Sequence, residues 1–309
     1  MPQIEHRLAS LRKMAVLCAV LVLLITSLSA FIRLTRAGLG CEPWPQCYGQ
    51  SARQVQQSAA PPASAWVAAV RITHRVTAVA ALLLIIVMLM ATLSKSPMLW
   101  REGRMVLGLL ALALFLAVLG RWTADARVPA VVLGNLLGGF AMFALSCGLA
   151  RRAPATSVPS REDRALRRWA VLGVMVLVLQ LILGGLVSAA HASLSCGGLA
   201  SCDLSGASWQ LLNPWHEPLF DQGDPINRAG ALVHWLHRAG ALLLVAVLLP
   251  LGVLAWRRGR AAGWMLILLL VLQVMLGAAL VLAGAPLAVA LAHNMVAALL
   301  LAVALSMCT

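Results

Sequence analysis

The sequence predicts an all-α integral membrane protein with eight transmembrane helices. We expect them to form two tandem four-helix bundles related by a pseudo-twofold axis along the membrane normal. Three observations support this fold: eight long apolar runs, an internal repeat, and an uneven distribution of positive charge between the connecting segments. Of the 309 residues, 61% are hydrophobic and 11% are charged, whereas a soluble domain has roughly 25% charged residues. This composition excludes a soluble protein.

The apolar runs are each near or above the roughly 20 residues that a helix needs to cross about 30 Å of hydrocarbon. They cover residues 14–32, 66–93, 104–122, 128–150, 169–190, 229–255, 261–283 and 286–307. The first run is long for a signal peptide and lacks a clean small-residue cleavage site. We therefore expect it to be a retained membrane span.

The net charge of +14 indicates membrane topology and not a nucleic-acid partner. With eight spans, 15 of the 24 Lys and Arg residues fall on the side that carries both termini. The positive-inside rule places that side in the cytoplasm. The sequence therefore predicts a multi-pass protein of the bacterial inner membrane with its long loops, 33–65 and 191–228, in the periplasm.

A tandem repeat of about 158 residues divides the chain into two halves. The repeated features are the pairs Cys41/Cys47 and Cys196/Cys202, the dipeptides His74-Arg75 and His237-Arg238, and the positions Asn135 and His293. Because each half holds four spans, both halves enter the membrane in the same orientation, as parallel repeats do. We place the boundary in the polar linker 151–168, giving an N-terminal half, 1–160, and a C-terminal half, 161–309.

Four of the seven cysteines lie in the two long external loops. Disulfides persist in an oxidising periplasm, and the within-loop bridges Cys41–Cys47 and Cys196–Cys202 are the simplest pairing. Four cysteines allow three connectivities, so the sequence leaves the pairing open.

Three histidines lie inside apolar runs at a matched depth: His74, His237 and His293. A rise of about 1.5 Å per residue puts each of them roughly 10–12 Å below the outer surface. Ionisable residues at such depth usually face a bundle interior and have a function. His237 and His293, on neighbouring helices of one half, suit bis-imidazole coordination of a heme iron. A zinc site fits less well, because no acidic residue lies in the spans and the loop cysteines are distant.

Arg75 and Arg238 follow two of these histidines and would point toward the outer face, where they could bind heme propionates. Alternatively, both arginines snorkel to the membrane interface. His234 lies one turn before His237, and either a contact with a propionate or a packing role is compatible with its position.

These motifs together resemble the heme A synthase family over essentially the whole chain. The carriers of the resemblance are the loop Arg36-Ala-Gly-Leu-Gly-Cys41-Glu-Pro-Trp-Pro-Gln-Cys47 and the motifs Thr-His74-Arg, Leu-His237-Arg and Ala-His293-Asn. The loop motif is fairly specific for the family. The short His-Arg pairs are weak evidence alone, but they become strong evidence because they occur at matching positions of the two repeats.

The resemblance implies an oxidoreductase that converts heme O to heme A by oxidising a ring methyl to a formyl group, for terminal oxidase assembly. It implies a heme b cofactor on His237 and His293, the substrate heme O near a catalytic His74, and loop disulfides that support activity or heme transfer. Expected partners are heme O, heme O synthase, oxidase assembly factors and membrane lipid, with no nucleic acid.

Two positions depart from the family pattern. Asn135 stands where the family commonly has a second histidine, and Arg71 stands where it commonly has a glutamate. An N-terminal heme would then have one protein ligand, with the other iron position open. The loss of the glutamate removes a carboxylate that could handle protons.

Three other functions compete with synthase activity. A bis-His heme carrier, for electron transfer or heme delivery, would explain a complete pair in one half only. A membrane thiol oxidoreductase would use the loop cysteines, but reactive pairs usually have Cys-x-x-Cys spacing. A transporter would need broken helices and buried charge near the membrane midplane.

Overall fold

The computed structural model describes residues 2–36, 39, 45–48, 65–94, 96–123, 128–151, 161–218 and 226–308. Within this part, eight helices are long and apolar enough to cross a membrane, and no strand is present. The predicted all-α, eight-span class is therefore confirmed. The helices are α1 (Pro2–Arg36), α3 (Ala65–Leu93), α4 (Trp100–Thr123), α5 (Pro129–Arg151), α6 (Arg161–Ala189), α7 (Ala231–Arg257), α8 (Ala261–Leu282) and α9 (Leu287–Ser306).

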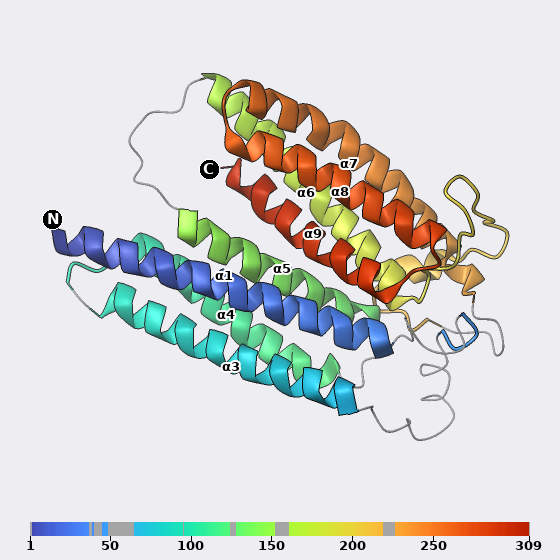
Figure 1. Ribbon diagram of the computed structural model, residues 1–309, viewed down its shortest axis with the longest axis horizontal. Helices are drawn as coiled ribbons and strands as arrows, with labels where there is room; N and C mark the ends of the chain where they lie inside the picture. Colours follow the sequence, from blue (N-terminus) through green and yellow to red (C-terminus); the bar gives the residue numbers. More distant parts are fainter. Residues whose placement is uncertain are drawn as a thin grey trace.

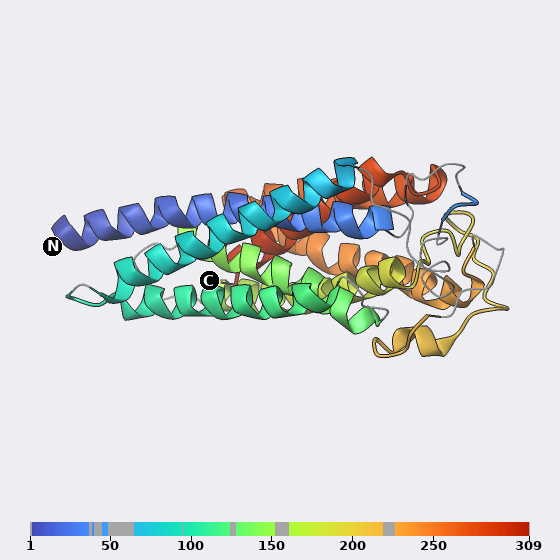
Figure 2. The same cartoon turned by 90° about the horizontal axis from the view of Figure 1, so that it is seen from below.

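The helices run along the long axis of the molecule, and both chain termini lie toward the same end (Figures 1 and 2). The segment between α6 and α7 lies at the opposite end and contains two short 3-10 helices, Trp209–Leu212 and Arg228–Gly230. We call this the loop end of the molecule.

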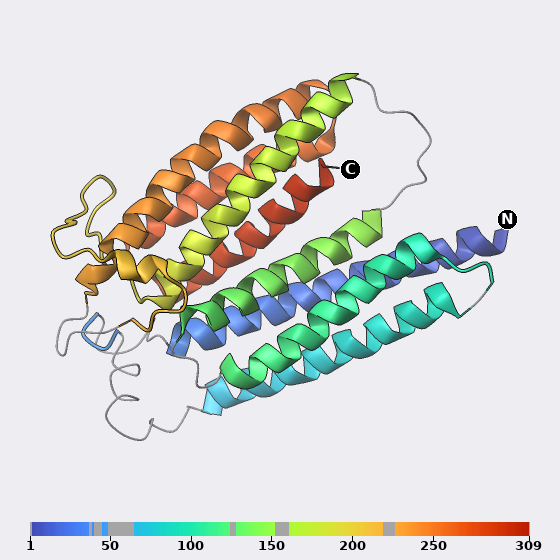
Figure 3. The ribbon, with the colours of Figure 1, turned by 180° about the vertical axis from the view of Figure 1, so that it is seen from behind.

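The helices pack as two sequential groups (Figures 1 and 3). In the first group α1 packs against α3 and α5, and α4 packs against α3 and α5. In the second group α7 lies between α6 and α8, and α8 packs against α9. The pseudo-twofold relation and the boundary at residue 160 stay predictions.

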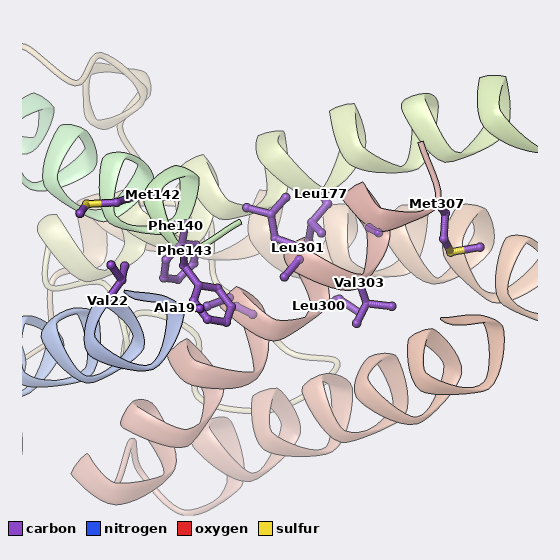
Figure 4. Close-up of a cluster of buried hydrophobic side chains, with 14 of the residues drawn as sticks. Ala19, Val22, Phe140, Met142, Phe143, Leu177, Leu300, Leu301, Val303 and Met307 are labelled. Atoms are coloured by element: carbon purple, nitrogen blue, oxygen red, sulfur yellow. The ribbon is translucent and has the colours of Figure 1, made fainter. Parts of the chain in front are cut away.

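The two groups meet along α1, α5, α6 and α9, where a buried apolar cluster fills the contact (Figure 4). Its members include Ala19, Val22, Phe140, Phe143, Leu177, Leu300 and Leu301. Because these side chains come from both groups, their packing fixes the position of α9 relative to α1 and α5.

The first helix is longer than the apolar run that predicts it. It begins at Pro2 and not near residue 14. The apolar run marks only the apolar part of the helix, and the polar residues before it continue the same helix. Arg7 donates hydrogen bonds to the carbonyl oxygens of Ala91 and Pro97, at 3.1 and 2.9 Å. The polar start of α1 is thereby attached to the connection between α3 and α4.

Candidate functional site

Two of the three predicted histidines come together inside the second group of helices. His237 is the seventh residue of α7, and His293 is the seventh residue of α9. Their ring centroids lie 6.5 Å apart, with an angle of 73° between the ring planes. Two imidazoles that bind one metal ion from opposite sides, each at about 2 Å from nitrogen to metal, have ring centres roughly 6 Å apart. The separation therefore suits one metal ion between the rings.

A glutamine of α6 holds His237. The amide nitrogen of Gln180 lies 3.0 Å from His237 Nδ1 and donates to the His237 carbonyl oxygen at 2.8 Å. The side chain is only 7% exposed, and its amide oxygen is buried without a hydrogen-bond partner. Gln180 thus contacts Nδ1, and Nε2 is the ring nitrogen that it does not contact.

A second glutamine, on α8, contacts His293. The amide nitrogen of Gln273 lies 3.1 Å from His293 Nε2. His293 Nδ1 and Gln273 Oε1 are both buried without a hydrogen-bond partner. Buried polar atoms are usually paired, so this pocket has hydrogen-bonding capacity that the protein itself does not use.

Glycines face both imidazole rings. A Cβ atom at Gly184 of α6 would lie 2.9 Å from His237 Cε1, and one at Gly277 of α8 would lie 3.3 Å from His293 Cε1. At Gly240, one turn after His237, a Cβ would lie within contact distance of Gln180 Oε1. Any larger residue at these three positions would displace the histidines or the glutamine that holds one of them.

The donor set fits heme better than a structural or catalytic zinc ion. Among the described residues, no group of three or more His, Cys, Asp or Glu side chains could hold a metal. Protein zinc sites use three or four such ligands, whereas a heme iron takes four nitrogens from its own macrocycle and needs two axial ligands. The His237–His293 pair offers that number of ligands.

The first group of helices lacks a matching pair. His74 lies half-buried on α3. Asn135, the seventh residue of α5, donates a 3.1 Å hydrogen bond to the hydroxyl oxygen of Ser29 on α1. This bond lies in the α1–α5 contact, and an amide at this position gives His74 no second imidazole of the kind that His293 gives His237.

The two arginines beside His74 differ in exposure. Arg75 is exposed, as are its neighbours Ile72 and Val76. Arg71 is partly buried, lies one turn before His74, and has a buried Nε atom without a hydrogen-bond partner. Of the two, Arg71 is the one whose side chain enters the protein, while the propionate role expected for Arg75 stays a prediction.

The second cysteine pair forms a disulfide that stands next to Arg238. Cys196 and Cys202 are bridged, with their Cα atoms 4.5 Å apart. Arg238 Nη2 donates to the Cys196 carbonyl oxygen at 3.1 Å, and Nη1 donates to that of Gly198. Of the first cysteine pair, only Cys47 lies within the described residues. Cys47 is disulfide-bonded, and Cys41 lies outside the described residues. The Cys41–Cys47 pairing therefore stays a prediction.

The two long cysteine-containing loops touch each other at Tyr48. Its ring centroid lies 5.8 Å from that of His191, at an angle of 56°. Burial raises the pKa of the Tyr48 hydroxyl to about 12, against a smaller opposing effect of its hydrogen bonds with Ser193. The residues Leu34, Leu39, Tyr48 and Ala285 form a small buried cluster at this contact.

Sequence reasoning missed Gln180, Gln273 and the three glycines. The glutamines did carry a signal, because they are the only two glutamines in the eight predicted apolar runs. The glycines carried none, since small residues are common throughout membrane helices.

Comparison with known proteins places this arrangement in a family. The sequence model of the cytochrome oxidase assembly proteins, COX15-CtaA, matches residues 12–305. The chain belongs to this family. It is also similar to a protein named heme A synthase from Shewanella oneidensis, with 32% identity over 311 aligned positions that cover 91% of each chain. The resemblance that the motifs predict is thus confirmed at the level of the family.

Proposed function

We propose that the chain is a heme A synthase, an oxidoreductase that converts the ring methyl of heme O into a formyl group and so supplies heme A to terminal oxidases. Membership of the family and similarity to a heme A synthase support the activity. The single structural observation that carries the proposal is the buried His237–His293 pair, with 6.5 Å between ring centroids.

His237 and His293 would hold a heme b cofactor in the second group of helices. When bound, such a heme supplies one-electron transfer, with a potential set by its axial ligands and their hydrogen bonds. Ligation through Nε2 of His237 requires a proton on Nδ1, which then needs an acceptor. The buried, unpartnered Oε1 of Gln180 could accept that proton if the amide turned, but the amide would then give up its present bond to the His237 carbonyl oxygen.

His74 would serve the substrate heme O in the first group of helices. Asn135 is bonded to Ser29, so the protein offers one imidazole here and leaves the opposite side of the substrate iron for an exchangeable ligand. Arg71, one turn from His74, adds a partly buried cation where the family commonly has an acid. Proton transfer would then depend on a group other than the side chain at position 71.

The orientation proposed from the charge distribution is a bacterial inner membrane protein with cytoplasmic termini and the cysteine loops in the periplasm. In that orientation the loop end of the molecule, with the Cys196–Cys202 disulfide, faces an oxidising compartment. We propose heme O synthase as the source of substrate and terminal oxidase assembly factors as the recipients of product.

Heme extraction tests the activity directly. The full chain is expressed with a heme O synthase in a host that lacks its own heme A synthase, and extracted hemes are separated by chromatography. We expect heme A in the presence of the chain and only heme O in its absence. Failure to form either heme A or a hydroxylated heme would contradict synthase activity.

A heme-delivery protein is the second candidate. The Asn135–Ser29 bond favours it, because a half without a second histidine suits reversible binding of a passing heme. In the same experiment, delivery predicts that purified chain carries heme O unchanged, and that heme O reaches an acceptor protein faster when the chain is present.

A further inference from the structure

His234 and Arg238 lie in the first turns of α7, on either side of His237 in sequence. They are four residues apart on α7, so their side chains share one face of the helix. His234 is only 5% exposed. Neither residue is needed as an iron ligand, because His237 and His293 already provide the two axial positions.

The guanidinium group of Arg238 is engaged by the backbone of the loop 190–202, and His234 lies beside the same loop. Arg238 donates from Nη2 to the Cys196 carbonyl and from Nη1 to the Gly198 carbonyl. His234 lies close to the backbone of Ala192, and its Nδ1 atom is buried without a hydrogen-bond partner.

The remaining atoms of the pair are buried and unused. Arg238 Nε and His234 Nδ1 are both inaccessible and without a hydrogen-bond partner. An unpaired buried donor or acceptor costs about 1–3 kcal/mol. Two of them, one helical turn apart and beside a candidate ligand, indicate a group that is bound there in the working protein.

The loop beside the pair is itself fixed. The Cys196–Cys202 disulfide closes it, Asn227 donates to the Ala190 carbonyl at 2.6 Å, and Ser195 donates to the Asn227 carbonyl at 2.6 Å. The carbonyl oxygens that accept from Arg238 therefore belong to a loop with its own cross-links.

We propose that His234 and Arg238 bind one carboxyl group, through Arg238 Nε–H as donor and His234 Nδ1 as the second contact. A carboxyl group with one shared proton matches this pair: one oxygen accepts from Arg238, and the proton lies between the other oxygen and His234. The inference rests on the proposed function, because we assign the carboxyl group to a propionate of the heme held by His237 and His293.

Esterified heme tests the carboxyl group itself. The full chain is purified from heme-depleted cells and loaded with iron protoporphyrin IX or with its dimethyl ester. The rate of heme loss to apomyoglobin is then measured. We expect the natural heme to leave about tenfold more slowly or better, the effect of one charge-assisted hydrogen-bonded contact. Equal rates for the two hemes would overturn the inference.

Two substitutions at one position test which ring nitrogen of His234 makes this contact. His234→Gln places an amide near the Nε2 position and leaves no polar atom near Nδ1, so the ratio of the two rates should fall close to one. His234→Asn places its amide near Nδ1 and should keep most of the ratio. The opposite order of the two variants would also overturn the inference.

Matched control variants test whether the effect belongs to the pair and to the heme. Arg257→Gln removes an exposed cation from the far end of the same helix and should leave the ratio unchanged, while Arg238→Gln should reduce it. If a lipid or fatty-acid carboxyl occupied the pair, esterifying the heme would have no effect. If the wild-type chain bound neither heme, the proposed heme b site itself would be contradicted. If it bound both hemes and released them at equal rates, only the proposed carboxyl contact would be contradicted.

Discussion

The two groups of helices differ in which polar side chains meet inside them. In the second group, histidines and glutamines from four helices converge, and glycines lie against the imidazole rings. In the first group, α1 and α5 are in close contact: a Cβ at Gly139 would lie 2.8 Å from the Thr26 side chain, and Asn135 bonds to Ser29. The comparison teaches that two similar sequence repeats can bring two imidazoles together in one half and an amide and a hydroxyl group in the other.

Removing either of the proposed ligands His237 and His293 should have the largest effect on this contrast. His237→Ala or His293→Ala should abolish the low-spin b-type spectrum of the purified protein, because one imidazole alone no longer provides bis-His ligation. Reduced-minus-oxidised spectra and the heme content by pyridine hemochrome measure the change. His74→Ala is the control from the other half, and it should keep the spectrum while losing conversion of heme O. An unchanged spectrum in both alanine variants would contradict the ligand assignment.

Replacing the glutamine behind His237 should weaken the site without removing a ligand. Loss of such an outer hydrogen bond typically lowers metal affinity by about 10–100-fold, and we expect a loss of this size for heme in Gln180→Leu. Titration of the depleted protein with heme measures the affinity. Gln210→Leu, in the short helix Trp209–Leu212 of the loop, is the control. Unaltered affinity in Gln180→Leu would mean that His237 is oriented by packing alone.

Filling the space beside His237 should have a smaller effect. Gly184→Ala puts a methyl group 2.9 Å from His237 Cε1, so the ring must move and heme affinity should fall roughly tenfold. Gly120→Ala is the matched control, because nothing lies within 4 Å of its Cβ and alanine favours a helix by about 1 kcal/mol. Equal heme affinities in the two variants would show that the His237 ring accommodates the new methyl group without moving out of place.

Restoring a second histidine should make the halves more alike. In Asn135→His, the new imidazole and His74 could ligate one further heme, so the heme content per protein should rise up to about twofold. Quantitative hemochrome analysis measures the ratio. Asn135→Ala, which removes the bond to Ser29 without adding a ligand, should give no such rise. A heme content that stays at the wild-type value in Asn135→His would show that the α1–α5 contact excludes a heme.

The smallest expected effect concerns Tyr48, at the contact between the two loops. It is measured by following the ionisation of the Tyr48 hydroxyl with pH. Tyr48 is the only tyrosine of the chain. An ordinary tyrosine ionises near pH 10, whereas burial raises the pKa of Tyr48 to about 12. Tyrosinate absorbance at 295 nm should therefore have a midpoint near 12 in the folded protein and near 10 after denaturation. Because the unfolded chain releases this proton first, the stability that Tyr48 contributes is complete below pH 10 and is lost as pH rises toward 12. A folded-state midpoint near 10 would contradict burial of the hydroxyl.

The sequence predicts the eight spans because long apolar runs leave few alternatives in a membrane. It also predicts a close approach of His237 and His293, since both lie at the same depth of one half. It does not predict that Asn135 turns to Ser29, because that depends on the rotation of α5 against α1. The exposure of Arg75 and the partial burial of Arg71 follow from the rotation of α3, which adjacent residues in a sequence do not reveal. The partners of Arg238 could not be predicted either. Its Nη atoms donate to backbone carbonyls, and because every residue has a backbone carbonyl, the residue types do not show which of them will accept.

The small cluster at the loop end has a consequence for how the chain is assembled. Tyr48 belongs to the segment between α1 and α3, but it is buried with Ala285, which lies in the turn between α8 and α9. A ribosome makes that segment long before the last hairpin, so the contact with Ala285 cannot form until the final two helices have been inserted. The complete cluster thus forms only at the end of biogenesis, and a chain stopped before α8 would lack the part of it that Ala285 supplies.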